Sequence, residues 1–122
     1  MIGVHTTVGN DSLFTVFHGV DQFVGTCPSP HGVSTFNFAP SNSDSYTVLI
    51  AYSTAENSNN SLQLLALKGS ERIAIGRTAD NQTVKYTKVR VVPLIGGGDR
   101  FGIFALNSDT NTMTVYLAEM IG

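Results

Sequence analysis

Residues 2–18 read Ile2-Gly-Val-His-Thr-Thr-Val8, then Gly9-Asn-Asp11, then Ser12-Leu-Phe-Thr-Val-Phe-His18. The first and third of these segments are rich in β-branched and aromatic side chains, which fit the pleated surface of a sheet. The short segment between them holds Gly, Asn and Asp, which stabilise tight turns through a left-handed backbone or through local hydrogen bonds. Two apolar runs joined by such a turn are typical of paired antiparallel strands.

Short apolar runs separated by turn residues recur along the whole chain at intervals of about ten residues, which predicts an all-β protein. We expect a two-sheet antiparallel sandwich or a jelly-roll-like barrel of about 8–10 short strands. The 122 residues suit one hydrophobic core, so residues 1–122 are expected to form a single β-sandwich domain. The predicted strands are residues 2–8, 12–18, 22–27, 33–38, 46–52, 61–67, 72–76, 83–92, 100–106 and 112–120.

The segment 61–69 has two interpretations. Ser61 could cap a two-turn helix that ends at Gly69. Alternatively, the segment is the first strand of a hairpin whose turn is Gly69-Ser70, a pair suited to a type II′ turn. In the hairpin Lys68 lies opposite Glu71, which gives a favourable cross-strand pair of charges. We favour the hairpin, and the helix is kept as the alternative.

The predicted strand 83–92 changes its apolar face partway along. Val84 and Tyr86 share one parity, whereas Val89 and Val91 share the other. Successive side chains of a strand point to opposite faces of the sheet. The shift therefore predicts either a β-bulge or a strand that leaves one sheet for another.

Charged side chains are scarce and unevenly distributed. They make up 13% of the chain against 42% hydrophobic residues, and disordered chains show the opposite balance. The net charge of −2 argues against binding through phosphate contacts, so we expect no nucleic acid partner. All of the basic residues lie in one stretch, and every charged residue before it is an acid. The basic residues are Lys68, Arg72, Arg77, Lys85, Lys88, Arg90 and Arg100.

The chain shows no sign of export or of a membrane partner. No stretch approaches the ~18 apolar residues of a spanning helix. The first residues, Met1-Ile-Gly-Val-His-Thr6, carry neither the positive charge nor the apolar run of a signal peptide. Cys27 is the single cysteine, so an internal disulfide is excluded. We expect a protein that is made in a host cytoplasm and released by lysis.

Residue types used in catalysis occur, but in no familiar arrangement. Cys27 and His31 lie on one proline-braced loop, where they could form a thiolate nucleophile or simply be a half-buried thiol and a loop histidine. Ser12, His18 and Asp21 are the residue types of a hydrolase triad, but no nucleophile elbow accompanies them. The three histidines are spaced by thirteen residues, unlike paired metal ligands. We expect no catalytic residue, no cofactor and no metal.

Two segments are candidate contact surfaces. Gly96-Gly97-Gly98 is followed by a predicted strand, without the Lys-Ser or Lys-Thr and the helix of a phosphate-binding loop. It predicts a flexible turn or a close approach of another backbone. Lys85, Lys88 and Arg90 surround Tyr86. They form either a solvated strand face or a docking face for an acidic neighbour.

A hydroxyl-rich surface without disulfides suits a viral structural protein, because assembly stabilises such a protein. Association also removes sheet edges from water. We therefore expect a non-enzymatic, bacteriophage-type virion protein that decorates or cements a capsid. It would be a homo-oligomer, with a trimer favoured, in contact with other virion proteins. The expected interface residues are Lys85, Lys88, Arg90, Gly96, Gly97, Gly98, Val115, Leu117, Met120 and Ile121.

The alternative function is that of a lectin-like, carbohydrate-binding module. Loops rich in Asn and Asp at one end of a sandwich can hydrogen-bond the hydroxyls of a surface glycan. Sugar rings usually stack on an aromatic side chain, and the chain contains no Trp. The stacking residues would have to be among Tyr46, Tyr52, Tyr86 and Tyr116.

Overall fold

The computed structural model describes residues 2–29, 32–42, 46–54, 62–77, 86–95, 99–107 and 109–120. These residues form ten strands and contain no helix, so the all-β prediction is confirmed. The strands are β1 (Ile2–Val8), β2 (Asp11–His18), β3 (Asp21–Pro28), β4 (Val33–Pro40), β5 (Thr47–Thr54), β6 (Leu62–Lys68), β7 (Glu71–Arg77), β8 (Lys88–Pro93), β9 (Asp99–Asn107) and β10 (Thr112–Met120).

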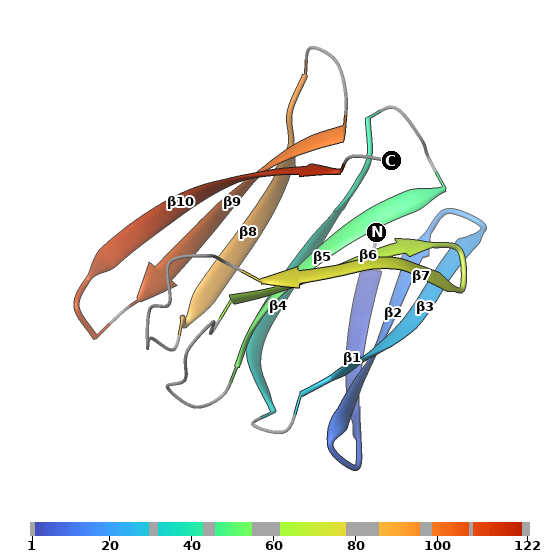
Figure 1. Ribbon diagram of the computed structural model, residues 1–122, viewed down its shortest axis with the longest axis horizontal. Helices are drawn as coiled ribbons and strands as arrows, with labels where there is room; N and C mark the ends of the chain where they lie inside the picture. Colours follow the sequence, from blue (N-terminus) through green and yellow to red (C-terminus); the bar gives the residue numbers. More distant parts are fainter. Residues whose placement is uncertain are drawn as a thin grey trace.

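The strands form three antiparallel sheets, which lie side by side as three layers in Figure 1. Sheet A has the order β1-β2-β3, sheet B the order β4-β5-β6-β7, and sheet C the order β8-β9-β10. Within each sheet, every strand pairs with the strand before or after it in the sequence. The expected antiparallel sandwich is confirmed, but the strands are divided among three sheets rather than two. Sheet B is the middle layer because apolar clusters cover both of its faces.

Three tight turns share one sequence form, a glycine followed by one further residue. They are Gly9-Asn10, Gly19-Val20 and Gly69-Ser70, and their glycines have φ angles of 62°, 63° and 60°. The second residue of each turn has no positive φ, which is the combination found in type II′ turns. The hairpin predicted over 61–69 is confirmed, and Lys68 pairs with Glu71 as expected. The helix alternative is wrong because this segment pairs with strands on both of its sides.

Strand β5 lies at the centre of the molecule, and all of its side chains are buried. Val48, Ile50 and Tyr52 belong to the cluster that faces sheet A. Leu49 and Ala51 belong to the cluster that faces sheet C. A strand that is buried on both faces needs apolar side chains at consecutive positions rather than at alternate ones. The unbroken run from Val48 to Tyr52 meets this requirement.

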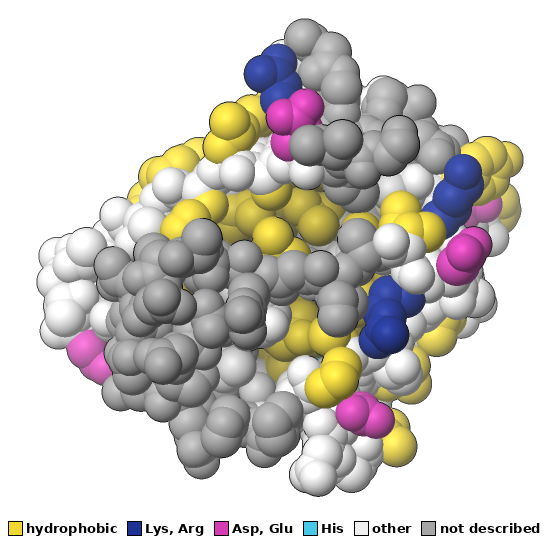
Figure 2. All heavy atoms as spheres, viewed as in Figure 1, with side chains coloured by type: hydrophobic (Ala, Val, Ile, Leu, Met, Phe, Trp, Pro, Cys, Tyr) yellow, Lys and Arg dark blue, Asp and Glu magenta, His cyan; other side chains and the backbone are white. Residues whose placement is uncertain are grey.

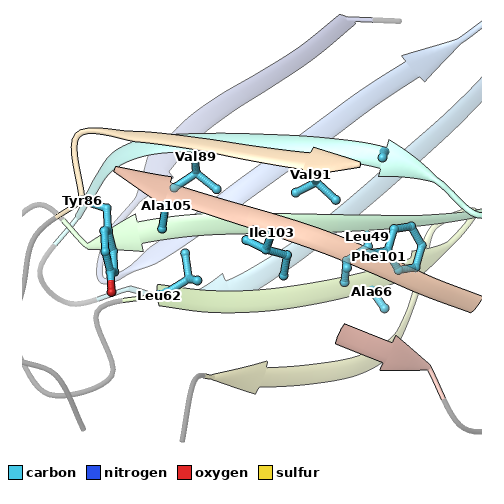
Figure 3. Close-up of a cluster of buried hydrophobic side chains, with 11 residues drawn as sticks. Leu49, Leu62, Ala66, Tyr86, Val89, Val91, Phe101, Ile103 and Ala105 are labelled. Atoms are coloured by element: carbon cyan, nitrogen blue, oxygen red, sulfur yellow. The ribbon is translucent and has the colours of Figure 1, made fainter. Parts of the chain in front are cut away.

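Sheets B and C pack through small and branched side chains, shown in Figure 3. The hydroxyl groups of Tyr86 and Tyr116 lie 3.0 Å apart and are hydrogen-bonded. This bond gives the hydroxyl group of the buried Tyr86 a hydrogen-bond partner. The buried members of the cluster are Ala39, Leu49, Ala51, Leu62, Ala66, Tyr86, Val89, Val91, Phe101, Ile103 and Ala105.

Two glycines of sheet A lie where its backbone meets side chains of sheet B. A Cβ atom on Gly25 would lie 2.3 Å from Cδ2 of Leu67. A Cβ atom on Gly3 would lie 2.2 Å from Cε1 of Phe38. Both distances are far below van der Waals contact, so a larger residue at either position would force Leu67 or Phe38 to move. The buried members of this cluster are Phe14, Val16, Phe23, Cys27, Val48, Ile50, Tyr52, Leu65 and Leu67.

The edges of sheet B also touch the neighbouring sheets. Strand β8 lies beside β4, and the backbone N–H of Val91 donates to Oδ1 of Asn37 at 2.8 Å. At the other edge, β3 lies beside β6 and β7, and the N–H of Val24 donates to the carbonyl of Gly69 at 3.2 Å. Sheet A packs on one face of sheet B, and sheet C packs on the opposite face.

The change of face predicted within 83–92 falls where β8 begins. Tyr86 is buried ahead of the strand, and its N–H donates to Oγ of Ser53 at 3.0 Å. From Lys88 onward the strand alternates regularly, with Val89 and Val91 buried. The shift therefore marks the start of β8 rather than a bulge within it, and residues 83–85 lie outside the described residues.

Candidate functional site

A chain of polar side chains lies between sheets A and B. Nε2 of His5 is hydrogen-bonded to Oγ of Ser12 at 2.8 Å, and Oγ of Ser12 is hydrogen-bonded in turn to Oγ of Ser29. The His5 ring packs against Phe14 and Phe36, with centroid distances of 5.1 and 6.1 Å. Burial lowers the pKa of His5 below its ordinary value of 6.5, because the imidazolium would be poorly solvated here.

The thiol of Cys27 is buried in the same layer. The hydroxyl of Tyr52 donates a hydrogen bond to Sγ of Cys27 at 2.9 Å. Burial, and next this hydrogen bond, raise the pKa of Tyr52 above its ordinary value of 10.0. Tyr52 therefore stays neutral at physiological pH, and the thiol serves as its buried acceptor. His31, the other member of the predicted pair with Cys27, lies outside the described residues.

The residue types of a hydrolase triad are not brought together. His18 and Asp21 are cross-strand partners at the β2–β3 turn. Ser12 lies six positions before His18 on β2, which is about 20 Å along an extended strand. Ser12 contacts His5 instead and has no exposed surface. A hydroxyl group that no substrate reaches cannot act as a nucleophile. The hydrogen bonds of Ser12 instead join β1, β2 and the residue after β3 on the inner side of sheet A.

We expect protonation of His5 to weaken the fold. The pKa of His5 is lowered in the folded state, so the unfolded state binds the proton more tightly. Stability is then complete above the unfolded pKa and declines as the pH falls from about 7 to about 5. The urea midpoint should fall further over this range in the natural protein than in His5→Gln, which keeps a polar partner for Ser12 but does not titrate. Parallel curves for the two proteins would contradict the expectation.

The outer side of sheet C, here named face C, exposes apolar side chains beside basic ones. Cross-strand partners share a face, and Arg90, Phe104 and Val115 form one row across the sheet. The three apolar side chains on β10 are 57–68% exposed, and Figure 2 shows apolar side chains along the course of this strand. Contiguous apolar surface with a polar rim marks interaction sites. Face C consists of Lys88, Arg90, Val92, Phe104, Met113, Val115 and Leu117, together with the cross-strand partners Arg100 and Glu119.

Four of the predicted interface residues lie together on face C. Lys88 and Arg90 come from β8, whereas Val115 and Leu117 come from β10, and β9 lies between the two strands. Met120 ends β10, and its side chain is outside the described part of the structure. Outside the described residues also lie Lys85, Gly96, Gly97, Gly98 and Ile121.

Sequence reasoning missed three members of face C, namely Val92, Phe104 and Met113. Val92 and Phe104 lie next to buried apolar residues in the chain, and the sequence therefore predicts that they too belong to the core. Their exposure follows from the register, which places Val92 opposite Gly102 and Phe104 opposite Val115. For Met113 a signal was present, because it shares the parity of Val115 and Leu117 on a single predicted strand.

Comparison with protein families, characterised proteins and solved structures gives no match.

The four tyrosines offered as stacking residues for a glycan differ in exposure. Tyr52 and Tyr86 are buried, Tyr116 is half-buried, and Tyr46 is 61% exposed. Because all four residues are described, Tyr46 is the one ring among them that presents a broad face to a ligand. A single exposed ring gives little support to the alternative of a carbohydrate-binding module.

The described residues offer neither a metal-binding cluster nor a membrane-spanning helix. Within the described part of the chain, no group of three or more His, Cys, Asp or Glu side chains gathers to hold a metal ion. No helix found there is long and apolar enough to cross a lipid bilayer.

Proposed function

We propose that this protein is a non-enzymatic structural subunit that works by binding further copies of itself. Its proposed place is the virion, where it decorates or cements the capsid. The observation that carries self-association is face C, where exposed Phe104, Met113, Val115 and Leu117 form a surface of apolar side chains on one sheet. Burying such side chains against another copy removes their apolar area from water.

The chemistry of the interior supports a structural role rather than a catalytic one. Ser12, His5 and Cys27 have the side chains most often used for nucleophilic chemistry. Ser12 is fully buried, and Cys27 accepts a hydrogen bond from a neutral tyrosine. The hydrogen bonds of His5 and Ser12 join strands of sheet A, and the hydrogen bond of Cys27 joins sheet A to sheet B, which is a role in stability.

The virion assignment draws on composition together with face C. Lys88 and Arg90 border the apolar patch on a chain whose first 67 residues contain no Lys or Arg. A subunit with separated charges presents complementary surfaces to further copies. Its single cysteine is buried and free, so its stability comes from packing and association instead of disulfides.

Native mass measured by light scattering tests the proposal. We expect an oligomer at low salt that dissociates in part at high salt, because salt screens the charges that border face C. Replacing Lys88 and Arg90 together with Gln should reduce the native mass at low salt and abolish most of its salt dependence.

The control for this experiment is the double change Lys68→Gln and Arg72→Gln. It removes two exposed positive charges from sheet B and leaves face C unchanged. This control should keep the native mass of the natural protein. A natural protein that remains monomeric at every salt and protein concentration would overturn the proposed self-association.

A further inference from the structure

We infer that face C of one copy docks on the outer side of sheet A of the next copy, so that all copies stack in one direction. The inference rests on the proposed self-association and specifies which surfaces meet. The outer side of sheet A is named face A. It consists of Ile2, Val4, Val8, Asp11 and Phe17.

Face A resembles face C in its arrangement of apolar side chains. Ile2, Val4 and Val8 share one parity on the edge strand β1 and are 66%, 47% and 56% exposed. Phe17 of β2 is paired directly with Ile2 and is 42% exposed. Cross-strand partners share a face, so these side chains form a continuous apolar surface. Each copy therefore carries two exposed apolar sheet faces. A symmetric dimer would use only one face of each copy.

The charges on the two faces decide which surfaces meet. Face C carries exposed Lys88 and Arg90. Face A carries exposed Asp11, and sheet A contains no Lys or Arg at all. Arg100 and Glu119 are cross-strand partners of opposite charge on face C, so Lys88 and Arg90 leave this face with a net positive charge. Contact between two copies of face C would bring these positive charges together, whereas contact between face C and face A places them near an acid. Like charges in an interface cost affinity, so the contact between unlike faces is favoured.

The layered fold determines the form of the assembly. Sheets A and C cover opposite sides of sheet B (Figure 1), so face A and face C point away from each other. A heterologous contact between opposite sides of a subunit repeats without closing and yields an open stack. The sequence alone favours a closed trimer. Such a ring would require two contact surfaces set at an angle to each other, not on opposite sides of the subunit.

A mixing experiment distinguishes this arrangement from other modes of association. Val4→Lys places a positive charge on face A, where it would oppose Lys88 and Arg90 of the next copy. Val115→Asp places a negative charge on face C, where it would oppose Asp11. Each variant retains one intact face, and each alone should be monomeric by light scattering. An equimolar mixture should associate with equal numbers of the two variants, because the intact face C of one variant meets the intact face A of the other. The altered faces carry opposite charges, so they can extend the heterodimer into an alternating stack.

The matched controls are Val20→Lys and Val20→Asp, which make the same changes in the fully exposed β2–β3 turn. Both should assemble like the natural protein, and unfolding curves should show that all four variants remain folded. If Val4→Lys alone still forms dimers, or if the mixture stays monomeric, the stacking inference is wrong while self-association survives. A monomeric natural protein would instead refute the proposed function itself.

Discussion

Replacing Tyr52 with Ala should remove about 3–5 kcal/mol from the free energy of unfolding. Tyr52 is fully buried at the centre of the middle sheet. Its ring packs against Phe14 at a centroid distance of 5.0 Å. The substitution leaves a cavity between sheets A and B and also removes the donor that Cys27 accepts. Since single domains are stable by about 5–15 kcal/mol, urea denaturation should show a large fall in the midpoint.

Two further variants separate the contributions of the Tyr52 ring and hydroxyl. Tyr52→Phe keeps the ring and should cost about 0.5–1.5 kcal/mol, the range for one hydrogen bond. Tyr46→Ala makes the same truncation at an exposed ring and should change stability by less than about 1 kcal/mol. If Tyr52→Ala costs no more than Tyr46→Ala, then sheet A is not packed on β5 in the way described.

Replacing Gly25 with Ala should cost about 1–3 kcal/mol, because the added methyl group overlaps Leu67. Gly25 lies on β3 and faces the middle sheet, and Leu67 is fully buried there. The two layers would have to separate or Leu67 would have to leave its rotamer. Thermal unfolding should shift downward by about 4 °C for each kcal/mol lost.

The overlap with Leu67 can be tested by a double-mutant cycle. In a Leu67→Ala background the space is empty, so Gly25→Ala should cost much less than in the natural protein. Gly102→Ala is the matched control on β9, because its new Cβ atom would lie 3.5 Å from the nearest atom, an ordinary contact. Equal costs at Gly25 in both backgrounds would mean that steric overlap with Leu67 is not the cause.

The strands could be predicted from the sequence because their signals are local. The glycine of each two-residue turn and the apolar runs on either side lie within a few residues of one another, and they predict strand ends closely. The hairpin of β6 and β7 followed from the turn pair Gly69-Ser70 and from the opposite charges of Lys68 and Glu71, which this turn places across from each other.

The number of layers could not be predicted in the same way, because it depends on which faces are covered by distant residues. One signal was available in the run Val48-Leu-Ile-Ala-Tyr52, which does not alternate and is typical of a strand buried on both sides. The run identifies a central strand but not its coverings. Phe14 and Ile103 cover its two sides from opposite ends of the chain, and no local pattern connects them.

The candidate surface was predicted in part. Lys88, Arg90, Val115 and Leu117 could be chosen as contact residues from their charge and apolar character, but their common face follows from the register with β9. The contact of Tyr52 with Cys27 joins residues 25 positions apart on two sheets. Such contacts depend on how layers are stacked, and strand patterns alone do not specify this stacking.

The pairing of each strand with its sequence neighbour has a consequence for how the chain reaches its native state. Sheet A is complete within residues 2–28, sheet B within 33–77 and sheet C within 88–120. Hydrogen-bonded ladders close over short loops, so the relative contact order of the pairings is low for an all-β protein. During synthesis, a ribosome would release the first sheet whole before the second begins to emerge. The inner face of the first sheet then becomes buried when the second sheet packs on it.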